Sequence, residues 1–411
     1  MAKLTQKNPS RSLLTAVWGP GLLATLADTD VGNIVTAAQG GALWGYRFLV
    51  LILALIPLLY LVQELTVRLG IFTGRGLGEL IRERYGVFWS WCSVFGLAIA
   101  AVGSLVTEFT GVAAVGEIYG LHRYVSLSMA AMALFAIVLL GSYRRIERIA
   151  LMLGLFEVAF FGVAWMAHPD LATIQKHVID LPITDHGFMY LAAALIGSAF
   201  NPWMIYYQQS AIADKRLQPE HYNAEKWDTA IGAILTQLLT AAVLITMAAT
   251  LGSGASASSL NNIRDVSEAL VPFLGESAAH LVFSLGVLGA AMVAAIVSAL
   301  ALGWSFAEAA GYHRAQEKPE TESSWFYRIY AVCIIGSATL VGWSHDLIWL
   351  DITVQVINAF MLPILIVLLL SFTQTMLPPE QRLNGWYLRT VIGLATIVCC
   401  VGIYGGMGGL L

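Results

Sequence analysis

Long runs of apolar residues, separated by short polar or Gly/Pro-rich breaks, extend along almost the whole chain. A helix needs about 20 largely apolar residues to cross a bilayer, and on this criterion the runs predict eleven spans. Their approximate ranges are 13–40, 46–70, 88–118, 124–142, 149–167, 187–212, 228–252, 276–308, 326–343, 348–374 and 387–409. The first run is too long for a cleavable signal peptide. The pattern therefore predicts an all-α membrane protein.

Composition supports this interpretation. The 411 residues are 58% hydrophobic and 12% charged, with a mean hydropathy of +0.73, whereas a soluble domain is roughly 45–50% apolar and about 25% charged. So few charges disfavour a soluble enzyme, and the net charge of −4 argues against a nucleic-acid partner. The expected surroundings are a lipid bilayer. The oligomeric state is left open, a monomer included.

The positions of Lys and Arg predict the orientation. If the N-terminus is cytoplasmic, the outer side carries only Arg47, Arg123, Lys176 and Arg264. Cytoplasmic loops are enriched in Lys and Arg. We therefore expect a multi-pass protein of the plasma membrane with residues 1–12 as a cytoplasmic tail. Because the number of spans is odd, the C-terminus is expected outside.

Two of the spans carry polar interruptions. Residues 26–33 include two carboxylates, a glycine and an asparagine, and residues 197–203 include Asn201 and Pro202. Proline removes a helical N–H and disfavours helix in the residue before it, although in membranes it often only kinks a helix. The two segments are five spans apart, which fits a 5+5 inverted repeat. Paired interruptions of this kind mark the substrate site of many transporters.

Several polar groups lie at bilayer depth. An ionisable residue there costs at least about 2.5–3.5 kcal/mol, so Asp28 and Asp30 need a partner, a proton or a hydrated cavity, and Asp28 alone could line a watery vestibule. Glu108 is a candidate proton relay or gate and, with equal weight, a hydrogen-bonded packing group. Gln355 could bind a ligand or bridge two helices, and Asn358 lies beside it. All eight histidines fall in predicted loops or at helix ends.

At the interrupted spans the sequence resembles the natural resistance-associated macrophage protein (Nramp) family of divalent-metal transporters. The resemblance is carried by Gly19-Pro20-Gly21, by Asp30-Val31-Gly32-Asn33 in place of Asp-Pro-Gly-Asn, and by segments 69–74 and 77–84. It implies a LeuT-like fold of two inverted five-helix repeats. These would be residues 13–167 and 187–374, with 387–409 as an eleventh helix.

The resemblance also implies a set of metal ligands. Asp30 and Asn33 of the first span would face the carbonyl near Ser198 and the side chain of Asn201 in the sixth. Gln355 would complete the site when the transporter occludes. The transported metal would be the substrate, and no cofactor is expected.

Departures from the family pattern bear on the metal. Asn201-Pro202-Trp203 replaces Met-Pro-His, so an amide oxygen stands for a thioether and an indole for a proton-pathway histidine. Asp28 occupies an aromatic position and adds a carboxylate to the expected ligands. These changes resemble a remote Nramp-related magnesium transporter branch. Oxygen ligands suit Mg²⁺, Ca²⁺ and Mn²⁺, whereas sulfur favours softer metals.

We therefore expect an importer of hard divalent cations that works by alternating access without tight proton coupling, with Mg²⁺ favoured over Mn²⁺. The alternative is a proton-coupled Mn²⁺/Fe²⁺ symporter. An intramembrane enzyme acting on a lipid phosphate is disfavoured, because Asp28-Thr29-Asp30 is a lone DxD motif without a candidate nucleophile or a basic phosphate cradle.

Overall fold

The computed structural model describes residues 24, 27–140, 158–167, 169–251, 260, 262–311 and 320–408, and these contain helices but no strand. The elements of the first part are α3 (Val31–Trp44), η1 (Gly45–Phe48), α4 (Leu49–Thr73), α5 (Leu77–Tyr85), α6 (Val87–Ile118), α7 (Arg123–Leu140), α9 (Ala159–Met166) and α10 (Leu171–Ile179). Those of the second part are α11 (His186–Ala199), α12 (Pro202–Asp214), η3 (Pro219–His221), α13 (Tyr222–Thr250), α14 (Arg264–Glu268), α15 (Val271–Leu274), α16 (Glu276–Ala310), α17 (Glu320–Trp343), α18 (Leu347–Thr375), η4 (Pro379–Gln381) and α19 (Gly385–Gly408).

Apolar helices match the predicted spans. Within the described residues, seven helical stretches are long and apolar enough to cross a membrane: Val31–Thr73, Val87–Ile118, His186–Asp214, Pro219–Thr250, Glu276–Ala310, Leu347–Thr375 and Gly385–Gly408. Two shorter apolar helices and α9 cover parts of the other predicted spans. Residues 13–23 of the first predicted span and 149–157 of the fifth lie outside the described residues. The prediction of an all-helical membrane protein is confirmed.

The stretch Val31–Thr73 is two helices, as the ranges 13–40 and 46–70 predict. The 3₁₀ turn η1 separates α3 from α4, and it begins at Gly45 with φ +60°, which favours glycine. Helix α10 covers this turn: His177 Nδ1 accepts a hydrogen bond from the Tyr46 N–H at 3.3 Å. Partial burial and the nearby Arg47 charge lower the pKa of His177 below its usual value.

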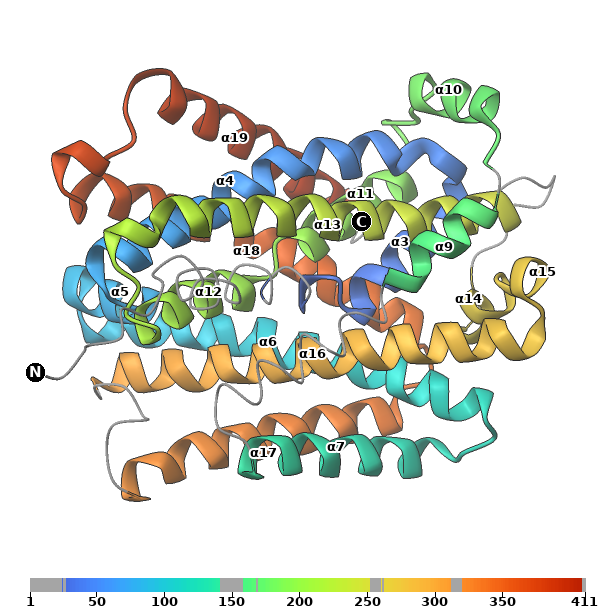
Figure 1. The fold of residues 1–411 in the computed structure, drawn as a ribbon, viewed down its shortest axis with the longest axis horizontal. Coiled ribbons are helices and arrows are strands. Elements are labelled where there is room, and N and C mark those ends of the chain that lie inside the picture. Colours follow the sequence, from blue (N-terminus) through green and yellow to red (C-terminus); the bar gives the residue numbers. More distant parts are fainter. Residues whose placement is uncertain are drawn as a thin grey trace, which may run out of the picture.

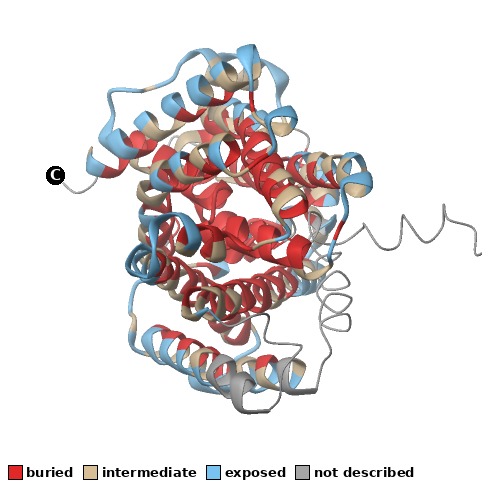
Figure 2. Cartoon of the chain, turned by 90° about the vertical axis from the view of Figure 1, so that its left-hand side faces the viewer, coloured by how far each residue is buried: buried red, intermediate tan, exposed pale blue. Residues whose placement is uncertain are grey.

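Helix α3 lies at the centre of the molecule, where it contacts α6, α11, α13 and α18 (Figure 1). Helices α7 and α17 pair at one edge, and α19 lies at the opposite edge. Buried residues gather in the middle and exposed ones coat the outside (Figure 2). The stretch His186–Asp214 is 94% buried over its apolar window, whereas that of α19 is 33% buried. The broken sixth span is thus central, and α19 faces outward with apolar side chains suited to lipid.

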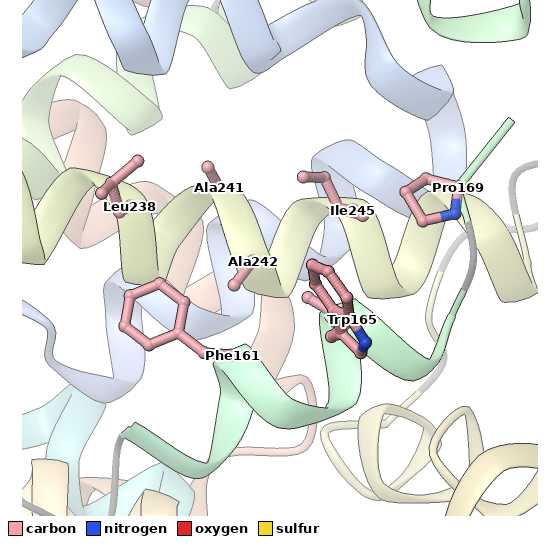
Figure 3. A pocket seen from close by; sticks show the side chains of 8 residues that line it. Phe161, Trp165, Pro169, Leu238, Ala241, Ala242 and Ile245 are labelled. Atoms are coloured by element: carbon pink, nitrogen blue, oxygen red, sulfur yellow. The ribbon is translucent and has the colours of Figure 1, made fainter. Parts of the chain in front are cut away.

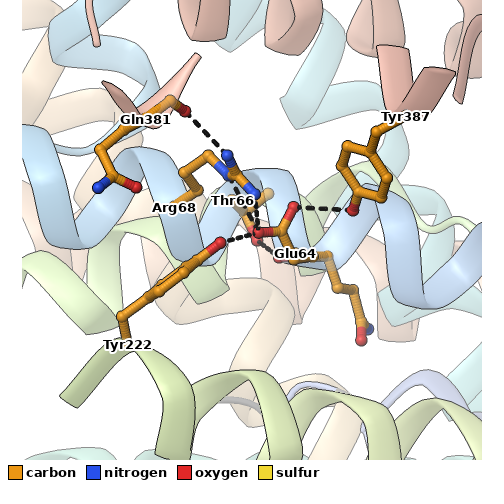
Figure 4. A network of polar contacts seen from close by, with 7 residues as sticks. Glu64, Thr66, Arg68, Tyr222, Gln381 and Tyr387 are labelled. Atoms are coloured by element: carbon orange, nitrogen blue, oxygen red, sulfur yellow. Dashed lines mark hydrogen bonds and ion pairs between the residues drawn. The ribbon is translucent and has the colours of Figure 1, made fainter. Parts of the chain in front are cut away.

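A buried ion pair within α4 is connected by hydrogen bonds to α13 and to the C-terminal elements (Figure 4). Glu64 Oε1 accepts from Arg68 Nε at 3.0 Å and Nη2 at 2.7 Å, and also from the Tyr222 hydroxyl. Glu64 Oε2 accepts from the Tyr387 hydroxyl at 3.3 Å, and Arg68 Nη1 donates to the Gln381 carbonyl at 2.8 Å. Both oxygens of this carboxylate therefore have donors. We call these five residues the Glu64 network.

Candidate metal centre between two interrupted helices

Both predicted interruptions are present in the backbone. Helix α3 begins at Val31, and Asp30 before it is extended, with ψ 174°. Helix α11 ends at Ala199, and α12 begins at Pro202, so Phe200 and Asn201 between them are not helical. Proline suits the first turn of a helix because its missing N–H has no helical acceptor there. The residues that predict the breaks therefore also form them.

Two glycines allow α18 to approach both breaks. A Cβ on Gly197 would lie 1.7 Å from the carbonyl oxygen of Gln355, and a Cβ on Gly32 would lie 1.9 Å from Gln355 Nε2. A larger residue at position 197 would push the backbone of α18 away, whereas one at position 32 would displace the Gln355 side chain. Gln355 consequently sits against the interruptions of the first and the sixth spans.

Three oxygens from the two broken helices converge on one nitrogen atom. Asn201 Nδ2 lies 3.0 Å from Asp28 Oδ1, 3.3 Å from Asp30 Oδ2 and 3.1 Å from the Ser198 carbonyl oxygen. All four residues are fully buried. The Ser198 carbonyl belongs to the last turn of α11, where the helix leaves its final carbonyls without helical partners. These four residues are the candidate site for a cation, and we call this candidate the metal centre.

No described side chain offers a positive charge to the two carboxyl groups. Asp30 Oδ1 caps α3 by accepting from the Asn33 N–H at 2.7 Å, where the helix dipole favours an anion. Within the described part of the chain, Asp28 Oδ2 has no hydrogen-bond partner, and no ion pair reaches Asp28 or Asp30. A buried pair of this kind can accept a positive charge from outside the protein.

Asn33 lies beside the metal centre with its oxygen turned toward α13. Its Nδ2 donates to Ser198 Oγ at 3.3 Å, and its Oδ1 accepts from Thr240 Oγ1 at 2.8 Å. The sequence places Asn33 in the site but does not single out Thr240, one of many hydroxyls in apolar helices. The Thr240 bond uses one of the two lone pairs of the Asn33 oxygen.

Helix α18 supplies two amides instead of the one predicted as a ligand. Asn358 Nδ2 donates to Asn201 Oδ1 at 2.8 Å and to Gln355 Oε1 at 3.1 Å. Among the described residues, neither Gln355 Nε2 nor Asn358 Oδ1 has a partner. The signal for Asn358 is its spacing, because residues three apart share a helix face. Asn358 thus links Gln355 to Asn201 of the metal centre.

Glu108 is held at the start of α3. Its Oε2 accepts from the Val31 N–H at 3.3 Å, and Thr107 Oγ1 lies 3.5 Å from its Oε1. Val31 stands where the resembling family has proline, which has no N–H to donate. This departure therefore gives Glu108 a backbone partner that the family pattern would not provide.

Other metal-binding arrangements are not found in the described residues. They contain no group of three or more His, Cys, Asp or Glu side chains that could hold a metal ion. An open cavity of about 580 Å³ lies between α9 and α13, but it is lined by apolar side chains such as Phe161, Trp165, Leu238 and Ile245 (Figure 3). The metal centre is the better candidate because it combines two carboxylates with amide and carbonyl oxygens.

Comparison with known proteins gives one family. A model described as natural resistance-associated macrophage protein-like matches residues 21–407. The divalent metal cation transporter MntH of Yersinia pestis is 29% identical over 308 residues, covering 72% of this chain and 74% of the relative. MntH of Chromohalobacter salexigens is 28% identical over 407 residues, covering 95% and 90%.

Solved structures show the same architecture. The manganese transporter of Eremococcus coleocola superposes with a TM-score of 0.78 at 19% identity, covering 97% of this chain and 87% of that one. MhsT in complex with L-phenylalanine gives a TM-score of 0.63 at 15% identity, covering 95% and 98%. At such low identity the likeness shows the fold alone. The predicted LeuT-like fold is confirmed.

Proposed function

The chain belongs to the Nramp family, and from this premise we propose that it carries divalent metal cations across the plasma membrane by alternating access. The metal is its substrate, bound in passing, and the protein is a transporter, not an enzyme. One observation carries the proposal: three oxygens from two broken helices surround a single point, and none of the described cationic side chains pairs with their carboxylates. Such a centre can accept a cation from solution.

The ligand chemistry favours a hard cation. The metal centre offers carboxylate, carbonyl and amide groups, which suit Mg²⁺ and Mn²⁺. Mg²⁺ gives up its waters reluctantly and is usually held by one or two carboxylates, which Asp28 and Asp30 supply. Relatives are named as manganese or divalent metal cation transporters, so we propose Mg²⁺ as the first substrate and Mn²⁺ as the second.

We propose that transport does not need protons. The membrane potential supplies about 4.6 kcal/mol for two charges moving inward at 100 mV, which sustains roughly a thousandfold gradient at about 1.4 kcal/mol per tenfold. Trp203 stands at the expected histidine position, and an indole N–H can donate a hydrogen bond but cannot take up and release a proton as an imidazole does. Glu108 is bonded to the Val31 N–H, which suits a gating contact better than a relay.

The arrangement in the membrane is also a proposal. The repeats are assigned to residues 13–167 and 187–374, with α19 in the eleventh span. Residues 1–12 are placed in the cytoplasm and the C-terminus outside, from the distribution of Lys and Arg. Labelling of Asn8→Cys and Leu410→Cys with a membrane-impermeant thiol reagent in sealed cells tests this orientation. Only the cysteine at position 410 should react.

Flux measurements test the proposed function. Purified protein in proteoliposomes is supplied in turn with Mg²⁺, Ca²⁺, Mn²⁺ and Cd²⁺ while a pH-sensitive dye reports the vesicle lumen. We expect Mg²⁺ and Mn²⁺ uptake driven by an inside-negative potential, without acidification. Stoichiometric acidification with strong Cd²⁺ competition would instead support the proton-coupled Mn²⁺/Fe²⁺ symporter. Absence of any divalent flux would overturn both.

A further inference from the structure

The Asn201 side chain presents its nitrogen, not its oxygen, to the metal centre. Its NH₂ group has two hydrogens, and these are shared among three oxygens at 3.0–3.3 Å. Asn201 Oδ1 points the other way and accepts from Asn358 Nδ2 at 2.8 Å. A donor group therefore lies where the carboxylates would hold a cation, and an amide oxygen is the atom that a cation needs there.

We propose that the Asn201 amide is a resident substitute for the transported cation and that it rotates by half a turn when the cation enters. This rests on the proposed function. In the hydrogen-bond pattern of the structure, the NH₂ hydrogens are directed at Asp28 and Asp30. After rotation, Asn201 Oδ1 joins the two carboxylates and the Ser198 carbonyl, so all four groups face the cation with oxygen.

Rotation of Asn201 requires a matching change on α18. The rotated amide directs Nδ2 at residue 358, and two NH₂ groups cannot bond to each other. Asn358 can answer by rotating as well, because its Oδ1 has no partner among the described residues. The displaced bond between Asn358 and Gln355 is restored if Gln355 rotates too, since its Nε2 also has no partner in the described part of the chain.

The three amides therefore form a chain with two complete hydrogen-bond patterns. An amide has nearly the same shape after half a turn, because its oxygen and nitrogen ends are of similar size, so neither pattern needs new space. In each pattern every amide donor between Asn201, Asn358 and Gln355 faces an amide acceptor. Only the rotated pattern directs the Asn201 oxygen at the cation. Asn358 is thus a positioning residue, which acts on the cation through Asn201.

A double-mutant cycle tests this role. Asn358→Asp puts an acceptor at residue 358, which opposes the present bond to Asn201 Oδ1 and supports the rotated pattern, but it also adds a negative charge. Asn201→Ala removes the rotating amide, so in that background Asn358→Asp acts through its charge alone. We measure Mg²⁺ affinity by calorimetry on the full chain. The gain from Asn358→Asp should be about tenfold larger with Asn201 present, as expected for one buried hydrogen bond.

Equal gains in the two backgrounds would overturn the rotation while leaving cation binding intact. If the wild-type chain binds neither Mg²⁺ nor Mn²⁺, the proposed function fails and the rotation with it. A second measurement needs no change at residue 358: infrared difference spectra of protein with ¹³C-labelled asparagine side chains. The carbonyl band of Asn201 is identified as the labelled band that is missing in Asn201→Ala. Mg²⁺ should shift this band in the wild type, and an unshifted band in the cation-loaded wild type would refute the rotation.

Discussion

The core holds two kinds of buried carboxylate, and they differ in what faces them. Glu64 accepts from the Arg68 guanidinium and from two tyrosine hydroxyls, so its charge is balanced within the protein. Asp28 and Asp30 share one neutral amide, and Asp28 keeps an oxygen without a partner among the described residues. Both groups are almost fully buried.

We propose that this difference separates a structural role from a transport role. A buried ion pair whose donors are complete holds elements together, and removing one partner leaves an uncompensated charge. Carboxylates at the ends of half-helices without a cationic side chain leave room for a cation from solution. The Glu64 network should therefore govern stability, and the metal centre should govern transport.

The largest effect is expected from Asp30→Ala. Uptake in proteoliposomes should fall roughly a hundredfold or more, because a carboxylate beside a dication contributes several kcal/mol. The loss of the helix cap costs only about 1 kcal/mol, so the thermal unfolding midpoint should change little. Asp30→Asn keeps an oxygen at the cap and removes the charge, and it should lose uptake equally. Wild-type uptake in either variant would refute the site.

Glu64→Gln should show the opposite pattern. It leaves Arg68 without its carboxylate, and breaking a buried pair costs about 3–5 kcal/mol. Arg68 is 14% exposed, so the lower end of that range is expected. The unfolding midpoint should drop by more than in Asp30→Ala. Calorimetry should find Mg²⁺ affinity within about twofold of wild type, as for distant independent sites. A large loss of affinity with unchanged stability would erase the distinction between the two regions.

Asn201→Met tests the hard character of the metal centre. A thioether favours softer metals, so the Mn²⁺-to-Mg²⁺ uptake ratio should rise about tenfold, equivalent to about 1.4 kcal/mol. Asn201→Leu has a similar size without sulfur and serves as the matched control, which should weaken uptake of both ions without changing their ratio. An unchanged ratio in Asn201→Met would count against the oxygen-ligand explanation.

A smaller effect is expected from Glu108→Gln. Glutamine keeps an oxygen that can accept from the Val31 N–H, so the contact at the start of α3 persists with a weaker bond. Uptake of Mg²⁺ should remain within about threefold of wild type, a change of under 1 kcal/mol, and it should stay independent of a proton gradient. Abolished uptake would indicate that Glu108 is a proton relay.

The smallest effect is expected at a surface contact outside both regions. The pKa of His177 is lowered in the folded protein, so the folded state binds fewer protons there than the unfolded state does. The bond from the Tyr46 N–H is complete above about pH 6.5 and weakens as the pH falls. The protection factor of the Tyr46 amide in hydrogen exchange, which corrects for the pH dependence of the intrinsic rate, should fall on acidification in the wild type but not in His177→Gln.

Much of the fold could be predicted from the sequence, because bilayer-crossing helices need long apolar runs. The breaks at Asp30 and Asn201 were also predictable, since Pro202, Gly32 and Gly197 act on the backbone locally. The resemblance carried by Asp30-Val31-Gly32-Asn33 indicated the family. These signals are short-range or compositional, and they survive without knowledge of tertiary packing.

The details of the metal centre depend on contacts between distant segments. The sequence predicts Asn201 as an oxygen ligand, but its orientation is set by Asn358, 157 residues away. Thr240 turns the Asn33 oxygen toward α13 from 207 residues away. In the sequence, Val31 shows only that the family's proline is missing. The structure shows in addition that its N–H donates a hydrogen bond to Glu108. Hydrogen-bond direction across helices leaves no periodic trace in a sequence.

Anomalous diffraction from crystals soaked in Mn²⁺, repeated with excess Mg²⁺, tests the central claim most directly. A Mn²⁺ peak between Asp28 and Asp30, next to the Ser198 carbonyl and weakened by Mg²⁺, is the predicted result. A peak held by sulfur or imidazole groups, or one unaffected by Mg²⁺, would contradict the account.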